Sequence, residues 1–189
     1  MREVIRTLIS AKEIELKVKE IAGLITRDYE KLLGFNESEQ PDGMTKLILV
    51  CILKGGVMFM VDLARQIPLP VAFEFMDISS YGMNSVSSGI VKIERDLDAA
   101  ITDQHVILME DIIDTGHTLN HLKNHLMAQH PASLKICALL DKQTRREVDI
   151  NADYIGFVIP DYFVVGYGLD YAQRHRNLPY VGILEFKED

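Results

Sequence analysis

Hydrophobic residues recur along the chain with two different periods, and this change of period predicts alternating strands and helices. Residues 47–53 form an uninterrupted apolar run, which is typical of a strand covered on both faces. Residues 14–25 instead place apolar side chains at helical spacing, directly after the capping-box pattern Ser10-x-x-Glu13. We therefore expect a helix over residues 11–33.

The same criteria predict the remaining elements. Strand-like patterns occur at 3–9, 71–78, 90–94, 106–110, 134–140, 154–159, 163–167 and 180–186, and helical patterns at 57–66 and 118–129. Polar segments at 34–45 and 79–89 are expected to be connections, the second a loop rich in Ser and Gly. Strands that alternate with helices indicate an α/β domain with a mainly parallel sheet.

Length and composition indicate the number of domains and the general class of protein. The chain has 189 residues, 48% hydrophobic and 25% charged, as expected for one soluble globular domain with an ample core. A net charge of −8 argues against nucleic acid as the main partner, since such binders usually present a basic face. Any anionic substrate must then be held by local donors or by a metal.

Cysteine usage and hydropathy point to the cytoplasm. Cys51 and Cys137 lie in apolar, strand-like runs, so we expect buried, reduced thiols. Charged residues interrupt positions 1–14, which excludes an obvious signal peptide, and the longest apolar run is far too short to cross a bilayer. We therefore expect a cytoplasmic protein that does not enter the membrane.

The segment from Val106 to Leu119 carries the clearest chemical information. Its apolar start is followed by Glu110, Asp111 and Asp114 and then by Thr-Gly-His-Thr. We expect a buried strand, an acidic loop and a helix N-terminus whose free N–H groups can hold a phosphate. Helix capping alone needs one acid, and like charges placed so close are unfavourable without a compensating cation. The pattern suggests a sugar phosphate bound with a divalent metal.

This segment resembles the phosphoribosyl diphosphate (PRPP) binding motif of type I phosphoribosyltransferases. The string Glu-Asp-Ile-Ile-Asp-Thr-Gly over 110–116 is similar to the hypoxanthine-guanine branch in particular. The resemblance implies that Asp114, Thr115, Gly116, His117 and Thr118 hold the ribose phosphate. It further implies that Glu110 and Asp111 lie near the ribose hydroxyls and Mg²⁺, and that Asp114 is the general base.

A second motif, Leu53-Lys54-Gly55, follows the buried run at 47–53. Alone it would be an ordinary strand-to-helix turn. The resemblance makes it the pyrophosphate loop, where glycine lets the backbone approach an anion. In this family the peptide bond before the lysine is often cis, so we expect a cis bond between Leu53 and Lys54.

A third motif, Ser80-Tyr81, opens the polar segment. The resemblance implies a mobile lid over about 79–91 that closes on the reaction centre and keeps water from the ribosyl cation. Met83 and Asn84 differ from the small and acidic residues expected in this lid.

Residues for the base come later in the chain. Alone, Lys142 would be a solvated charge and Phe163 a core residue. The resemblance implies that Lys142 donates to the exocyclic oxygen of a 6-oxopurine, that Phe163 stacks on the ring, and that Val164 supplies backbone contacts. A site that hydrogen-bonds a substrate group can reject analogues without it by ~10⁴-fold or more.

The string Val-Val-Gly-Tyr-Gly-Leu-Asp-Tyr over 164–171 is similar to the same branch. It implies that Asp170 is a direct or water-mediated Mg²⁺ ligand and that Arg176 contacts pyrophosphate. Magnesium suits such a site because it accepts few carboxylates together with water and phosphate oxygens.

Taken over roughly residues 4–186, the resemblance implies the type I phosphoribosyltransferase fold. This is a central, mainly parallel sheet flanked by helices, with a small hood formed by about 1–10 and 142–189. The implied reaction joins hypoxanthine, and also guanine, to PRPP, and the implied assembly is a homodimer or homotetramer. A preference for guanine or xanthine and a non-catalytic PRPP-binding regulator remain alternatives.

Overall fold

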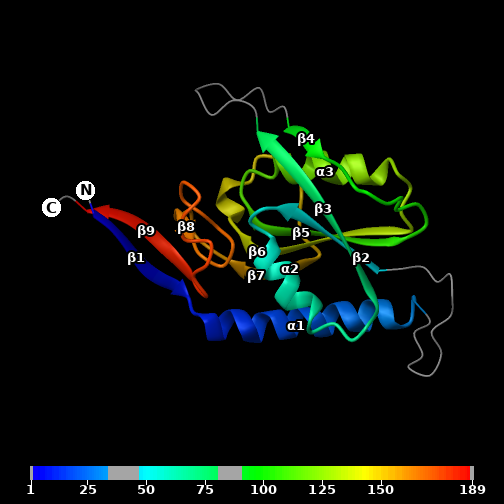
Figure 1. Ribbon diagram of the computed structural model, residues 1–189, viewed down its shortest axis with the longest axis horizontal. Helices are drawn as coiled ribbons and strands as arrows, with labels where there is room; N and C mark the ends of the chain where they lie inside the picture. The colour runs from blue at the N-terminus through cyan, green and yellow to red at the C-terminus, as the bar shows by residue number, and fades with distance from the viewer. Residues whose placement is uncertain (1, 34–46, 81–90, 188–189) are drawn as a thin grey trace.

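A computed structural model describes residues 2–33, 47–80 and 91–187, which form two sheets and three α-helices (Figure 1). In chain order the elements are β1 (Arg2–Ile9), α1 (Ala11–Glu30), β2 (Leu47–Leu53), α2 (Val57–Ala64), β3 (Val71–Ser80), β4 (Val91–Arg95), β5 (His105–Ile113), α3 (His117–Met127), β6 (Ser133–Asp141), η1 (Gln143–Arg145), β7 (Tyr154–Val158), β8 (Val164–Val165) and β9 (Val181–Lys187).

The larger sheet has six strands in the order β4-β3-β2-β5-β6-β7. Its neighbouring strands run parallel, except that β4 is antiparallel to β3 at one edge. The predicted α/β class with a mainly parallel sheet is confirmed. From β2 the chain adds strands toward one edge, and from β5 it adds them toward the other. The junction of β2 and β5 is therefore the topological switch point, where open α/β sheets bind ligands.

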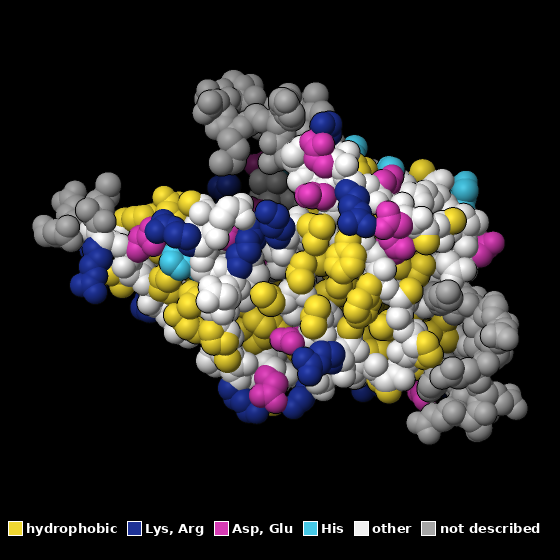
Figure 2. All heavy atoms as spheres, in the orientation of Figure 1, with side chains coloured by type: hydrophobic (Ala, Val, Ile, Leu, Met, Phe, Trp, Pro, Cys, Tyr) yellow, Lys and Arg dark blue, Asp and Glu magenta, His cyan; other side chains and the backbone are white. Residues whose placement is uncertain are grey.

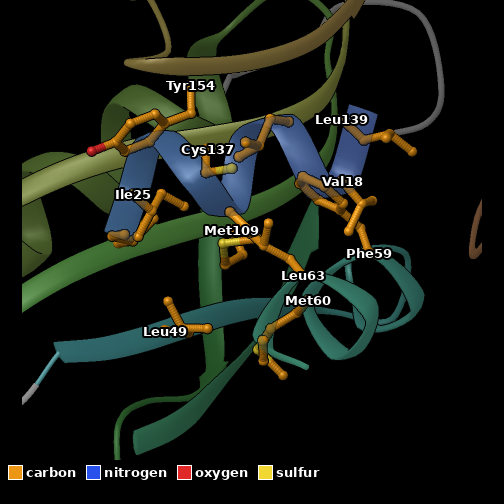
Figure 3. Close-up of a cluster of buried hydrophobic side chains, with 14 of the residues drawn as sticks. Val18, Ile25, Leu49, Phe59, Met60, Leu63, Met109, Cys137, Leu139 and Tyr154 are labelled. Carbon is orange, nitrogen blue, oxygen red and sulfur yellow. The ribbon is translucent and has the colours of Figure 1, made fainter. Parts of the chain in front are cut away.

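Helices cover both faces of this sheet and create two cores. In one of them α1 and α2 pack on β2, β5, β6 and β7, as the buried side chains of Val18, Phe59, Met109 and Cys137 show (Figure 3). On the opposite face, α3 buries Leu119, Leu122 and Leu126 against β2, β5 and β6. The central strand β2 is buried from Leu47 to Ile52, which explains its unbroken apolar sequence.

Helix α1 begins as the sequence predicts. The Ser10 hydroxyl accepts a hydrogen bond from the Glu13 main chain, and the Glu13 carboxylate accepts one from the Ser10 N–H, at 2.8 Å. This reciprocal capping box satisfies two N–H groups that the first helical turn leaves without partners. The helix ends at Glu30, three residues before the predicted end.

A smaller antiparallel sheet, in the order β1-β9-β8, lies beside the main domain. The long pair of β1 and β9 brings the two ends of the chain side by side (Figure 1). Of the residues 142–189 expected in a hood, only β8 and β9 join β1, because β7 pairs with β6 in the six-stranded sheet.

Two local expectations were wrong. Glu110 and Asp111 do not lie in an acidic loop, because β5 continues to Ile113, where it still pairs with Asp141 of β6. The strand expected over 163–167 contains only β8, since Gly166 turns back to bridge Leu169.

No helix among the described residues is long and apolar enough to cross a membrane.

Candidate active site

A cavity of about 370 Å³ opens at the carboxyl ends of β2 and β5, the switch point of the sheet. It collects residues from four segments of the chain, one of which contributes only Ile78 of β3. Its lining includes Leu53, Lys54, Gly55, Glu110, Asp111, Asp114, Thr115, Gly116, Thr118, Asp170 and Arg176. The loop after β2, the end of β5 with the start of α3, and the segment after β8 therefore form one site.

The loop after β2 lies tightly against the rest of the site. The Leu53–Lys54 peptide bond is cis, which confirms the prediction. A Cβ atom on Gly55 would overlap the Oδ2 atom of Asp111, and one on Gly168 would overlap the Gly55 carbonyl oxygen. The main chain at Gly55 is thus packed between β5 and the segment after β8, where a larger residue would displace a neighbour.

Helix α3 begins at the cavity without a side-chain cap. Its N-cap, Gly116, has φ of 90°, a left-handed conformation that glycine adopts without the steric cost of a side chain. A Cβ there would also lie 2.6 Å from the Ile150 Cγ2 atom. The first turn of α3 therefore keeps N–H groups available, and an anion at this end is favoured by the helix dipole.

Glu110 and Asp111 place two neighbouring carboxylates in the wall of the cavity. Burial, together with repulsion from the Asp111 charge, raises the pKa of Glu110 well above its ordinary value. Burial also raises the pKa of Asp111, although the Ile112 N–H donates to its Oδ1 atom at 2.8 Å. Two carboxylates that are this difficult to ionise together favour a bound cation.

Asp170 and Arg176 also line the cavity and contact each other. Arg176 Nη2 is 2.7 Å from Asp170 Oδ1, while Arg176 Nη1 donates to the Gly168 carbonyl at 2.8 Å. The second Asp170 oxygen accepts from the Gln173 N–H at 2.8 Å. Among the described residues, no group of three His, Cys, Asp or Glu side chains is arranged to hold a metal unaided.

Lys142 lies outside this cavity but is joined to it. Its main-chain N–H donates to the Ile113 carbonyl at 2.9 Å, just before Asp114. The buried Lys142 side chain directs Nζ to Asp161 Oδ1, at 3.2 Å. The interpretation of Lys142 as a solvated charge, which its sequence context alone favours, is therefore wrong.

Three other predicted residues are not in the cavity wall. His117 is on the surface, where its ring nitrogen is 2.9 Å from Glu147. Phe163 is 54% exposed and meets Tyr171 edge to face, with ring centroids 5.7 Å apart. Val164 is buried in β8, opposite Ile183.

The predicted lid falls almost entirely outside the described residues. Ser80 ends β3, but its side chain is not described, and Tyr81 lies outside the described ranges. Ser79 is described, and its hydroxyl donates to Glu94 of β4 at 2.8 Å.

With the geometry in place, comparison with known proteins decides the family. Residues 10–172 match the family described as "Phosphoribosyl transferase domain". The chain belongs to the phosphoribosyltransferase family.

Close relatives place it within one branch of that family. It is 47% identical to the hypoxanthine phosphoribosyltransferase of Haemophilus influenzae, over 96% of each chain. It is 44% identical to the hypoxanthine-guanine phosphoribosyltransferase of Bacillus subtilis, over 95% of this chain and 93% of that protein. The hypoxanthine-guanine branch suggested by the motifs is therefore confirmed.

Solved structures agree with this phosphoribosyltransferase assignment. A hypoxanthine-guanine phosphoribosyltransferase from Bacillus anthracis superposes with a TM-score of 0.84 at 41% identity, covering 98% of this chain and all of that one. The type I phosphoribosyltransferase fold is confirmed with it.

The motif comparison missed a group of charged residues around Asp114. Arg145 Nε donates to the Asp114 carboxylate at 3.1 Å, and Arg146 Nη1 donates to the Asp114 carbonyl at 2.6 Å. Arg146 also pairs with the buried Asp141. The only sequence signal was the cluster of basic residues 142–146 directly after a strand, which by itself resembles a solvated surface.

Proposed function

We propose that this protein is a purine salvage enzyme that transfers the 5-phosphoribosyl group of PRPP to hypoxanthine, and also to guanine. The products are the nucleoside monophosphate and pyrophosphate. One observation carries the proposal: the acidic end of β5, the N-terminus of α3 and the Lys54 loop meet in a single cavity at the switch point of the sheet.

The 5′-phosphate of PRPP would bind at the start of α3, where main-chain N–H groups of residues 115–118 are available. The left-handed Gly116 supports this, because it turns the chain into the helix with no side chain in the way. The Lys54–Gly55 main chain would bind the pyrophosphate, with Lys54 adding a positive charge. Since the whole chain carries −8, these local donors have to hold the anion.

The donor set of the cavity fits Mg²⁺. Glu110 and Asp111 offer hard carboxylate oxygens, and a cation would offset the burial and mutual repulsion that raise the pKa of Glu110. Asp170 would act through water, because both its oxygens are engaged by Arg176 and Gln173. When bound, Mg²⁺ supplies neutralisation of the leaving pyrophosphate. Arg176 would hold Asp170 in place and add positive charge near the pyrophosphate.

The base would lie between Lys142, Phe163 and the Asp114 end of β5. Lys142 Nζ is held by Asp161 and has further protons to donate to a 6-oxo group. Exposure of the Phe163 ring supports a role in stacking, since a large apolar side chain gains nothing from solvent. Val164, fixed in β8, would add main-chain contacts.

Asp114 would act as the general base. As the purine attacks the anomeric carbon, the bond between that carbon and pyrophosphate breaks and a proton on the five-membered ring passes to the Asp114 carboxylate. Ser80, Tyr81 and the lid over about 79–91 would exclude water during this step. The small sheet of β1, β9 and β8 would form the hood above the base.

A panel of bases tests the function. The purified protein is incubated with magnesium, PRPP and hypoxanthine, guanine, xanthine or adenine, and pyrophosphate release is followed. Release with hypoxanthine and guanine but not adenine supports the proposal, whereas a preference for xanthine would change the assigned substrate. No release with any 6-oxopurine rejects the enzyme and favours a PRPP-binding regulator.

The base role is tested with Asp114→Asn. We expect turnover to fall on the order of 10²–10⁴-fold, the usual contribution of a positioned base, with PRPP binding nearly unchanged. Asp98→Asn, which changes an exposed carboxylate paired with Arg95, is the matched control. Full turnover in Asp114→Asn would remove Asp114 from this role.

The metal site is tested by thermal unfolding. Mg²⁺ with PRPP should raise the melting temperature of the wild type, since a ligand that binds only the native state stabilises it. Glu110→Gln together with Asp111→Asn should lose most of this increase. An equal increase in both proteins would place the metal elsewhere.

We also propose a cytoplasmic homodimer or homotetramer. Hydrophobic side chains gather on the surface over α2 and β3, where Met58, Val61 and Phe73 are exposed (Figure 2). In the related hypoxanthine phosphoribosyl transferase of Trypanosoma cruzi, 39% identical, the C-terminal region has a role in oligomeric state and enzymatic activity. Light scattering of the purified protein would give the mass, and a monomer at micromolar concentration would contradict this expectation.

A further inference from the structure

Four charged side chains from three segments form a continuous ionic chain beside the cavity. Arg145 Nε donates to Asp114 Oδ1 at 3.1 Å, and Arg145 Nη1 lies 3.7 Å from Asp161 Oδ2. Asp161 Oδ1 in turn accepts from Lys142 Nζ at 3.2 Å. Arg145 and Asp161 thus connect the carboxylate of Asp114 to the ammonium group of Lys142.

The main chain at Asp114 is held independently of its side chain. Arg146 Nη1 donates to the Asp114 carbonyl, and Arg146 Nη2 is paired with the buried Asp141 at the end of β6. Arg146 therefore holds the Asp114 main chain, while the Arg145 side chain contacts Asp114 through its carboxylate. The two consecutive arginines therefore contact different parts of Asp114. A substitution at Arg145 should alter the orientation of the Asp114 carboxylate while Arg146 still holds the main chain.

The Arg145 contact engages one of the two Asp114 carboxylate oxygens. Oδ1 is occupied by Arg145, and within residues 2–33, 47–80 and 91–187 no side chain or main-chain group donates to Oδ2. A carboxylate held by one oxygen keeps a fixed orientation and can still accept a proton at the other. Stability gives no reason for this arrangement, because Arg145 and Asp114 are both about half exposed and exposed ion pairs contribute little.

We propose that Arg145 is a positioning residue that orients Asp114 and fixes its distance from Lys142 through Asp161. This rests on the proposed function, in which Asp114 accepts a proton from the five-membered ring and Lys142 donates to the 6-oxo group. In a 6-oxopurine the exocyclic oxygen and the N7 nitrogen of the five-membered ring lie on one edge of the base. The two protein groups that meet this edge must therefore be correctly spaced, and the bridge through Arg145 and Asp161 sets that spacing.

The chemistry predicts a specific kinetic signature. Arg145→Gln should lower kcat with hypoxanthine by roughly tenfold or more, because small misplacements of a catalytic group are costly. The KM for PRPP should change less than about twofold, since the phosphate and pyrophosphate contacts are untouched. Arg145→Lys keeps the charge but loses the planar fork that spans two carboxylates, so it should recover only part of kcat.

A double-mutant cycle separates positioning from a general structural effect. Arg145→Gln, Asp161→Asn and the double variant are compared by kcat/KM for hypoxanthine at saturating PRPP, with melting temperatures measured alongside. If Arg145 acts through the bridge to Asp161, the double variant loses less than the product of the two single losses. Arg27→Gln, which changes an exposed arginine in the last turn of α1, should keep full activity.

The outcomes are distinguishable from failure of the proposed function. A wild-type protein without activity on any 6-oxopurine rejects the proposed function itself. An active wild type with an unchanged kcat in Arg145→Gln, or with multiplicative effects in the cycle, overturns the role of Arg145 alone. A reduced kcat with an unchanged melting temperature and a non-multiplicative cycle supports it.

Discussion

Gly55 and Asp111 approach so closely that the Asp111 carboxylate occupies the space where a side chain on Gly55 would begin. The two residues lie in different motifs, one after β2 and one near the end of β5. Their contact joins the loop expected to bind pyrophosphate to the carboxylates expected to bind metal. Each motif therefore restricts the residues that the other can accept.

Gly55→Ala should inactivate the protein without unfolding it. The new Cβ meets the end of a flexible side chain, so Asp111 can rotate away at little cost in stability. The displaced carboxylate then loses its place in the cavity, and we expect an activity loss of about 10²-fold, as for other small misplacements of catalytic groups. Steady-state rates and a thermal melt of the same sample measure both quantities.

Gly23→Ala is the matched control. Nothing lies within 4 Å of a Cβ at this position of α1. Alanine in a helix interior is more favourable than glycine by roughly 0.5–1 kcal/mol, so this variant should be slightly more stable and fully active. Comparable activity in Gly23→Ala and Gly55→Ala would contradict the importance of the Gly55 contact.

Gly116→Ala should weaken both the fold and PRPP binding. A left-handed conformation costs a residue with a Cβ about 1–2 kcal/mol, and here the Cβ would also press on Ile150 at 2.6 Å. Chemical denaturation should show a stability loss of at least that size. Isothermal titration should show weaker PRPP binding, because the first turn of α3 shifts. Wild-type affinity in this variant would argue against the phosphate site.

Glu3 should influence catalysis from the N-terminal strand. Its carboxylate accepts from Arg174 at 2.5 Å and lies 3.1 Å from the His175 ring nitrogen. These contacts anchor the turn before Arg176, where Gln173 and His175 both have positive φ. Glu3→Gln should raise the KM for PRPP several-fold and cost less than about 1 kcal/mol of stability, as expected for a partly exposed ion pair.

Glu185→Gln provides the comparison for Glu3. Glu185 lies on the neighbouring strand β9, half exposed, and among the described residues its ion pair is with Arg6, at 3.9 Å, rather than with the turn. An unchanged KM for PRPP is expected. Equal kinetic effects of both substitutions would show that the small sheet responds as a whole and that Glu3 has no special role.

Both thiols should be unreactive in the native protein. Burial raises the pKa of Cys51 to about 12, and burial also raises the pKa of Cys137. The reactive thiolate is therefore almost absent at pH 8, and a thiol reagent should label neither residue until denaturant is added. Rapid labelling of either cysteine under native conditions would contradict its burial.

The same shifts predict how stability changes with alkali. A thiol with a higher pKa in the native state holds its proton more tightly there than in the unfolded chain. The free energy of unfolding should then fall as pH rises above the ordinary thiol value of about 9. Cys51→Ala should remove part of this alkaline slope in denaturation curves.

Local patterns predicted most of the framework. The capping box at Ser10 and Glu13, the apolar run of β2 and the helical spacing in α1 depend on interactions within a few residues, so they can be read from the chain alone. The boundaries were less predictable. The extension of β5 to Ile113 depends on pairing with β6, a strand about thirty residues further along the chain.

Some residues of the candidate site could likewise be predicted from the sequence, and others could not. The acids of the Glu110–Thr118 segment and the Lys54–Gly55 turn were visible as motifs, and family resemblance supplied Lys142 and Asp170. Arg145 and Asp161 had no motif, because their importance depends on charges that lie close only after folding. From sequence alone, basic residues that form specific ion pairs after folding cannot be distinguished from basic residues that only face solvent.

The sequence by itself determined the class of fold, the order of its elements and the residue types able to bind a phosphorylated sugar and a metal. These follow from periodicity, capping and the chemistry of neighbouring side chains. Only the tertiary structure decided that β2 and β5 lie side by side, that Gly55 touches Asp111 and that Arg145 connects Asp114 to Asp161. Such contacts join residues tens of positions apart, and their energies depend on distance and burial, which the linear order of residues does not contain.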